Sequence, residues 1–250
     1  MSHNNRRVAM VSGGSRGVGA AIVRRLAADG WDVSFSYRDD ELAAIKTEKA
    51  AGELGARVFA TEVDVRLAAE VTEWFARAED ELGPVDAMVS CAGIARDRPL
   101  ALIPEAEWRT VIDTGLDGVF HLCRTAASAM MKRRSGRIVT VSSVCGEYDH
   151  APAAHHTLTR PGVDGFVQSL ASQAARFGVS VNAVTPGPVI RPRDVAALVP
   201  EEGRHDLAET IALRRFGSVA DVADLVAFAL SPEAESLTGR VLEVPAAILL

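Results

Sequence analysis

Apolar residues along this chain follow two spacings in turn, which predicts strands alternating with helices. Runs of about four to eight apolar or β-branched residues fit buried strands, and the longer stretches between them repeat apolar residues at helical spacing. Strands are expected at 8–12, 31–37, 56–63, 85–90, 137–143, 179–184 and 240–244. Helices are expected at 18–30, 40–54, 67–82, 104–134, 157–177 and 219–229, with the longest interrupted near Gly115 and Gly118. This alternation predicts an α/β fold, a Rossmann-type doubly wound parallel sheet.

The chain of 250 residues shows no internal repeat, linker or low-complexity tract. We therefore expect one domain over residues 1–250, in which the irregular region 191–218 forms a substrate lid. The net charge of -6 gives no reason to expect nucleic acid or an anionic membrane as a partner. No apolar run is long enough to span a bilayer, the N-terminus lacks a signal-peptide core, and the three cysteines are scattered, so a cytoplasmic location is expected.

The strongest motif is the glycine turn after the first predicted strand, Gly13-x-x-x-Gly17-x-Gly19. A strand, a glycine turn and a helix N-terminus make an anion site, because free N–H groups and the positive end of the helix dipole face the ligand. A glycine triplet alone often marks only a tight turn, but this setting favours a dinucleotide pyrophosphate. The candidate cofactor-binding residues of the turn are Gly13, Ser15, Arg16, Gly17, Val18 and Gly19.

Two arginines indicate which dinucleotide this is. Arg38 follows the second predicted strand, where an acidic residue would bind the ribose hydroxyls of NAD and an arginine can hold a 2′-phosphate. Arg16 lies inside the glycine turn, and Asp39 and Asp40 are expected to begin the next helix. Either arginine could instead be a solvated surface charge, but together they favour NADP(H).

The motifs SGGSRGVG, Asp64-Val65, CAGIARDRPL, GRIVTVSSVCG, VSVNAVTPGPV and LTGRVLEV together resemble the short-chain dehydrogenase/reductase family. The resemblance covers essentially the whole chain and is closest to 3-oxoacyl-carrier-protein reductases. It implies that Asp64 hydrogen-bonds the adenine amino group, with Val65 also binding the cofactor, and that Ala92 and Gly93 line the adenosine ribose. It further implies that the nicotinamide is walled by Pro186, Gly187 and Val189. It also implies a homotetramer or homodimer paired through 104–134 and 157–177, although the apolar residues of these helices could equally be core.

The catalytic set of that family is Asn, Ser, Tyr and Lys, and this chain keeps only the serine, Ser143. His156 and Arg160 replace the Tyr-x-x-x-Lys pair, and Gly115 stands in the asparagine position. Their spacing of four puts His156 and Arg160 on one helix face. Histidine suits acid–base work near neutral pH, but a neighbouring arginine disfavours the imidazolium, and arginine cannot pass a proton on.

His156 could also be a filler in an unused cleft, and Ser143 a strand-end cap. His155 is expected to point away from His156 and to be exposed, and its spacing to His150 and Asp149 matches no common zinc pattern, so no metal is expected.

These residues favour an NADPH-dependent ketoreductase of unusual mechanism that acts on a small-molecule carbonyl substrate, with Ser143, His156 and Arg160 at the reacting end. A carrier-bound or polyketide intermediate is a plausible substrate, because an activated carbonyl needs less acid assistance. Two alternatives stay open. One is a cyclase, dehydratase or isomerase that uses His156 as a base, and the other is a catalytically silent NADP(H)-binding subunit.

Overall fold

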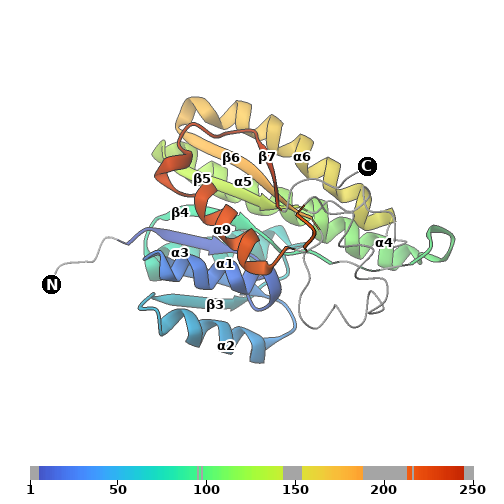
Figure 1. Cartoon of the computed structure of the whole chain (residues 1–250), viewed down its shortest axis with the longest axis horizontal. Helices are drawn as coiled ribbons and strands as arrows, with labels where there is room; N and C mark the ends of the chain where they lie inside the picture. Colours follow the sequence, from blue (N-terminus) through green and yellow to red (C-terminus); the bar gives the residue numbers. More distant parts are fainter. Residues whose placement is uncertain are drawn as a thin grey trace.

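The structure is a computed structural model, and it describes residues 6–94, 96, 98–142, 154–187, 213–215 and 217–244. Its strands form one parallel sheet in the order β3-β2-β1-β4-β5-β6-β7 (Figure 1). The strands are β1 (Val8–Val11), β2 (Asp32–Tyr37), β3 (Val58–Glu62), β4 (Val85–Ser90), β5 (Gly136–Val141), β6 (Val179–Pro186) and β7 (Val241–Val244). The α-helices are α1 (Gly17–Ala28), α2 (Glu41–Gly52), α3 (Ala68–Leu82), α4 (Glu105–Ile112), α5 (Gly118–Arg133), α6 (Ala154–Ala174) and α9 (Val219–Ala229).

The sheet is buried on both faces, which explains why its central strands read as continuous apolar runs rather than as alternating ones. All four residues of β1 are buried. Helices α3, α5 and α6 cover one face and enclose one apolar cluster. Helices α1, α2 and α9 cover the other face and enclose a second cluster (Figure 1). The predicted doubly wound parallel sheet is therefore confirmed.

The long helix predicted at 104–134 is divided by a π-helical turn at Asp113–Asp117, between α4 and α5. The interruption expected near Gly115 is thus present, as a widened turn rather than a break. Helix α6 begins at Ala154 rather than at 157, so its first turn includes His155 and His156. None of the helices in the part of the chain that the structure describes is long and apolar enough to cross a membrane.

The position of a ligand site follows from the strand order. The chain builds outward from β1 to β3, then returns to place β4 on the other side of β1 and continues to β7. Two neighbouring strands whose connections leave in opposite directions open a crevice at their carboxyl ends, where such folds bind nucleotides. Here those strands are β1 and β4, and we expect the ligand at their carboxyl ends, beside the turn after β1 and the segment after β4.

Candidate active site

The turn after β1 is compact because its glycines leave no room for side chains. A Cβ atom on Gly19 would lie under 3.0 Å from the carbonyl oxygen of Gly13. Gly13 has a φ of +68°, and its own Cβ would lie 3.0 Å from Cα of Ala92. The backbone of the turn therefore approaches both α1 and the segment after β4 as closely as backbone can.

Ser12 fixes this turn to the neighbouring strand end. Its hydroxyl oxygen accepts hydrogen bonds from the backbone N–H groups of Cys91, at 2.9 Å, and Ala92, at 3.0 Å. Its own N–H donates to the carbonyl of Val89 at 3.0 Å. The sequence gives no sign of this contact, because nothing in the local pattern indicates a partner about eighty positions away.

The N-terminus of α1 opens into the same crevice. Arg16 is the N-cap residue, no side chain caps this end of the helix, and its first turn contains no acidic residue. The first N–H groups of a helix have no intrahelical acceptor, and an uncapped end therefore suits an anion. With the glycine turn, these features fit a dinucleotide pyrophosphate.

The two arginines expected at the 2′-phosphate, Arg38 after β2 and Arg16 in the glycine turn, are exposed and paired with aspartates. Arg38 Nε donates to both carboxylate oxygens of Asp39 at 3.1 Å, and its side chain is 40% exposed. Arg16 Nη1 lies 3.9 Å from Asp40 Oδ2 and its side chain is 70% exposed. Asp40 also accepts from the backbone N–H of Ala43 at 3.0 Å and caps α2, so its expected place at the start of that helix is confirmed. Surface pairs of this kind exchange partners at little cost, which leaves both guanidinium groups available to a phosphate.

Asp64 already has a cationic partner. Both the backbone N–H and the guanidinium of Arg66 donate to its carboxylate, and these bonds hold the Asp64 pKa below its usual range. A carboxylate has further acceptor positions, so the adenine contact implied for Asp64 stays a prediction. Arg66 was missed by the sequence reasoning, although its place two residues after Asp64 is an adequate signal.

Helix α6 places His156 and Arg160 at the carboxyl edge of the sheet, where they are 5% and 8% exposed. Arg160 Nη2 lies 3.4 Å from Nδ1 and 3.5 Å from Nε2 of His156, and Nη1 lies 3.5 Å from the carbonyl oxygen of Val141 at the end of β5. A Cβ atom on Gly93 would lie 3.4 Å from Arg160 Nη2. The guanidinium therefore sits between the end of β5, the segment after β4 and the imidazole.

His156 is a neutral imidazole at physiological pH. Burial first, and then the positive charge of Arg160, lower its pKa from 6.5 to about 4, and the backbone of Ile94 only partly opposes them. A neutral histidine is a poor proton donor, but it can accept a proton or donate one hydrogen bond. The buried pair is thus suited to binding and polarising a polar group, not to protonating it.

The lowered pKa of His156 predicts how the free energy of unfolding depends on pH. The His156 pKa is lower in the folded protein than in the unfolded chain, so the unfolded chain binds more protons between pH 6.5 and pH 4. The free energy of unfolding that is present above pH 6.5 is therefore lost as the pH falls towards 4. For His156 the loss is on the order of 3 kcal/mol. We expect His156→Phe to lose clearly less unfolding free energy than wild type between pH 7 and pH 4.5 in urea titrations. Parallel pH dependences would contradict a buried neutral histidine.

His155 is fully buried, so the expectation that it is exposed is wrong. Helix α4 packs against the first turn of α6 and covers it. The imidazole is stacked on Trp108, with ring centroids 6.5 Å apart, and its Nε2 lies 3.6 Å from Glu107 Oε1. Among the residues that the structure describes, no three metal-ligating side chains come together. Asp149 and His150 lie outside that part of the chain.

Several predicted site residues cannot be located in the same way. Ser143, Val189 and most of the predicted lid at 191–218 lie outside the described residues. Pro186 ends β6 and Gly187 follows it, where the Gly187 N–H donates to the Val244 carbonyl at 2.6 Å. The structure therefore brings together, around one crevice, the glycine turn, Ala92 and Gly93, and the buried pair on α6.

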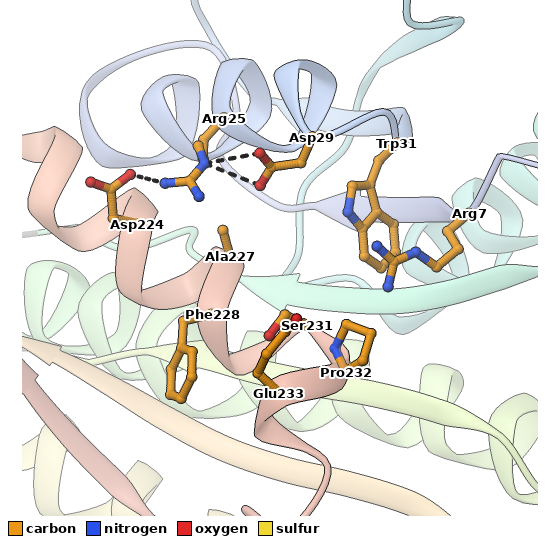
Figure 2. Close-up of a pocket in the computed structure, with 10 residues that line it drawn as sticks. All are labelled: Arg7, Arg25, Asp29, Trp31, Asp224, Ala227, Phe228, Ser231, Pro232 and Glu233. Carbon is orange, nitrogen blue, oxygen red and sulfur yellow. Dashed lines mark hydrogen bonds and ion pairs between the residues drawn. The ribbon is translucent and has the colours of Figure 1, made fainter.

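A second hollow of about 460 Å³ lies at the opposite, amino edge of the sheet, between α1 and α9 (Figure 2). Most of its charged side chains already form ion pairs or ring contacts with one another. Arg25 pairs with Asp29 and Asp224, and the guanidinium of Arg7 lies 4.0 Å from the centre of the Trp31 ring. With its main cation held between two carboxylates, this hollow offers no acid, base or anion site comparable to the crevice.

The fold and the crevice together define a dinucleotide-binding protein with polar side chains at the reacting end. Residues 13–246 match the family described as "Enoyl-(Acyl carrier protein) reductase". The chain is 34% identical over 239 residues to 3-oxoacyl-acyl-carrier-protein reductase FabG of Staphylococcus epidermidis, covering 94% of this chain and 96% of the relative. It is 36% identical to acetoacetyl-CoA reductase of Synechocystis sp., covering 95% of this chain and 94% of the relative.

Among solved structures, an actinorhodin polyketide ketoreductase with NADPH superposes with a TM-score of 0.89 at 30% identity, covering 98% of this chain and 97% of that one. The chain belongs to the short-chain dehydrogenase/reductase family. The relatives that it resembles are carbonyl reductases by name, and their likeness extends over nearly the whole chain.

Proposed function

We propose that this protein is an NADPH-dependent ketoreductase with an altered reacting end, in which Ser143, His156 and Arg160 stand where the family uses Ser, Tyr and Lys. The observation that carries the proposal is the buried pair His156 and Arg160, which lies at the carboxyl edge of the sheet beside an intact glycine turn. The named relatives reduce carbonyl compounds, and one of the similar structures contains NADPH, which supports the same chemistry here.

In this proposal one group of residues binds the cofactor and a second group binds the substrate carbonyl. The glycine turn and the N-terminus of α1 hold the pyrophosphate, and Arg38 and Arg16 hold the 2′-phosphate. Arg160 lies against Gly93 and binds the nicotinamide ribose, since a guanidinium keeps the positive charge that a lysine would supply. His156 and Ser143 hydrogen-bond the substrate carbonyl. The cofactor supplies a hydride when it is bound.

The same geometry favours an activated substrate. A neutral His156 gives little acid assistance, so the carbonyl must accept a hydride readily, as a β-keto thioester or a polyketide intermediate does. A carrier-bound substrate agrees with the name of the staphylococcal relative.

We also propose a homodimer or homotetramer paired through α5 and α6, where Phe120 is 43% exposed. Val119, Leu122 and Val163 of the predicted pairing faces are instead buried in the protein's own core.

Fluorescence titration with NADPH and NADH tests the cofactor part of the proposal. Arg38→Ala should weaken NADPH binding about tenfold or more, because it removes a charge-assisted partner of the 2′-phosphate. It should leave NADH binding unchanged. Arg24→Ala, which removes an exposed arginine on α1, is the matched control. Equal losses for both dinucleotides, or no loss for either, would reject Arg38 as the 2′-phosphate ligand.

One observation favours a second function. A histidine that is neutral at pH 7 can act as a base, which suits a cyclase, dehydratase or isomerase. That enzyme forms product with no fall in nicotinamide absorbance, whereas the ketoreductase consumes one NADPH for each product. A catalytically silent NADP(H)-binding subunit predicts that His156→Phe and Ser143→Ala leave the biological activity unchanged.

A further inference from the structure

A third polar side chain extends the stripe formed by His156 and Arg160. Asp164 follows Arg160 by four residues on α6, so the three residues lie on one helix face, one turn apart. The Oδ1 atom of Asp164 is buried and has no hydrogen-bond partner among the residues described. A buried carboxyl oxygen without a partner is costly to maintain, and so it calls for an explanation.

The sheet presents two hydroxyl groups to this side of α6. Ser142 follows β5 and Thr185 lies on β6, and they are 5% and 4% exposed. The strand register pairs Val141 with Val184, which places the next residues, Ser142 and Thr185, side by side. Side chains alternate along a strand, and Ala183 belongs to the cluster under α5 and α6, so Thr185 faces the same helices. Within the described part of the chain, neither hydroxyl has a partner in good hydrogen-bonding geometry, although Ser142 lies close enough to Asp164 to lower the pKa of its carboxyl.

Burial is the main reason that Asp164 favours its protonated form. Burial raises the pKa of its carboxyl, and the nearby Glu243 carboxylate raises it further. Glu243 comes from β7, where it pairs in register with Thr185. The Ser142 hydroxyl and the Arg160 guanidinium lower the pKa without cancelling the rise. Asp164 is therefore a carboxyl group that can hold a proton at a higher pH than usual.

The proposed reduction requires such a group. A carbonyl that receives a hydride also needs one proton on its oxygen. His156 lacks the acidic proton of an imidazolium, because its pKa of about 4 leaves it neutral. Arg160 cannot lose one, and Gly115 has no side chain in the place of the family's asparagine. Of these four positions on α6 and in the π-helical turn, only Asp164 is an acid whose raised pKa favours a bound proton, and it lies on the same helix face.

We propose that Asp164 is the proton store of this site and exchanges its proton through the hydroxyls of Ser142 and Thr185. The inference rests on the proposed ketoreductase function. In each turnover the Asp164 carboxyl loses one proton, which ends on the carbonyl oxygen while the carbonyl carbon takes the hydride. The carboxylate regains one proton from water before the next turnover. Asp164 acts on the substrate through other groups and does not touch it.

The test is the number of protons released when NADP⁺ or NADPH binds, measured by calorimetry in two buffers of different ionisation enthalpy at a series of pH values from acidic to neutral. The oxidised nicotinamide adds a positive charge and favours the carboxylate, so wild type should release up to about one proton more with NADP⁺ than with NADPH. The 2′-phosphate also titrates near pH 6, but it is common to both forms and cancels in the difference.

The variants have distinct expected outcomes. Asp164→Asn should abolish the difference, and Asp164→Glu should retain it. Glu243→Gln should move the release to lower pH, because Glu243 raises the Asp164 pKa. Asp80→Asn, an exposed acid on α3, is the matched control and should behave as wild type. Thermal melts establish that each variant is folded. If Asp164→Asn does not fold, Ser142→Ala replaces it. That variant should move the proton release to higher pH, because Ser142 lowers the Asp164 pKa.

The results separate the two proposals. If both dinucleotides bind wild type and release equal numbers of protons, or if Asp164→Asn keeps the wild-type difference, the proton store is overturned while cofactor binding stands. If neither dinucleotide binds, the ketoreductase proposal fails and the proton store fails with it.

Discussion

Replacing Gly19 with alanine is expected to reduce NADPH affinity at least about 100-fold, a loss of about 2.7 kcal/mol. The added Cβ would lie under 3.0 Å from the carbonyl oxygen of Gly13, and this neighbour is backbone, which cannot rotate away. To relieve the contact, the turn must move from α1, which displaces the helix N–H groups that we expect to face the pyrophosphate. Fluorescence titration measures the affinity, and thermal melts measure the smaller loss of stability.

Gly52→Ala is the matched control for this variant. Gly52 ends α2, a Cβ atom there would meet no other atom within 4 Å, and its backbone does not require a positive φ. Alanine at this position should leave NADPH affinity unchanged and should not destabilise the protein. If Gly19→Ala bound NADPH as tightly as Gly52→Ala, the turn would not be the pyrophosphate site.

The parts of the site that the sequence predicted depend on local rules. A glycine is required where the backbone turns with positive φ or passes another backbone closely, and Gly13 and Gly19 meet these requirements. The parallel sheet follows from apolar runs that alternate with amphipathic helices. Asp40 was predicted to begin α2 because carboxylates favour helix N-termini, and it caps that helix. In each case the signal in the sequence lies within a few residues, even where the contact that it predicts is distant.

The parts that were missed depend on contacts between distant segments. His155 was expected to be exposed because its helix face differs from that of His156, but α4 covers that face with Trp108. Asp164 attracted no attention in the sequence, since an isolated aspartate on a helix is usually solvated. Its Oδ1 atom is nevertheless buried, and the Ser142 hydroxyl that acts on its carboxyl is about twenty residues away along the chain. No periodicity in the sequence reports such packing.

The packing around Gly115 explains how the reacting end could change while the cofactor end did not. Gly115 lies in the π-helical turn, and a Cβ there would lie 3.0 Å from Cγ2 and 3.2 Å from Oγ1 of Thr159. The methyl and hydroxyl of Thr159 thus occupy part of the space in which the family's asparagine would begin. Thr159 is fully buried, and its hydroxyl donates to the His156 carbonyl at 2.8 Å. Residues 115, 156, 159 and 160 therefore form one packing unit, so the family's side chains must be restored together.

Restoring all four positions should produce ordinary ketone reduction. In the variant Gly115→Asn, His156→Tyr, Thr159→Ala, Arg160→Lys, a phenol can donate its proton, a lysine can lower the phenol pKa, and the smaller residue 159 makes room for the asparagine. General acid catalysis contributes about 10²–10⁴-fold in rate, and we expect a gain of this order over wild type. The measurement is NADPH consumption with acetoacetyl-CoA, the substrate named for one of the relatives.

The control is the same variant with His156→Phe in place of His156→Tyr. It has nearly the same shape and packing but lacks the phenol oxygen, so it should show none of the gain. A second comparison keeps Thr159, and there the added asparagine at position 115 should lower the melting temperature because its Cβ crowds the threonine. If the fourfold variant folds and binds NADPH but reduces no faster than its phenylalanine control, then the loss of proton transfer is not what separates this protein from its relatives. The difference would then lie in the substrate pocket, where hydride transfer would depend on a carbonyl compound of a different shape.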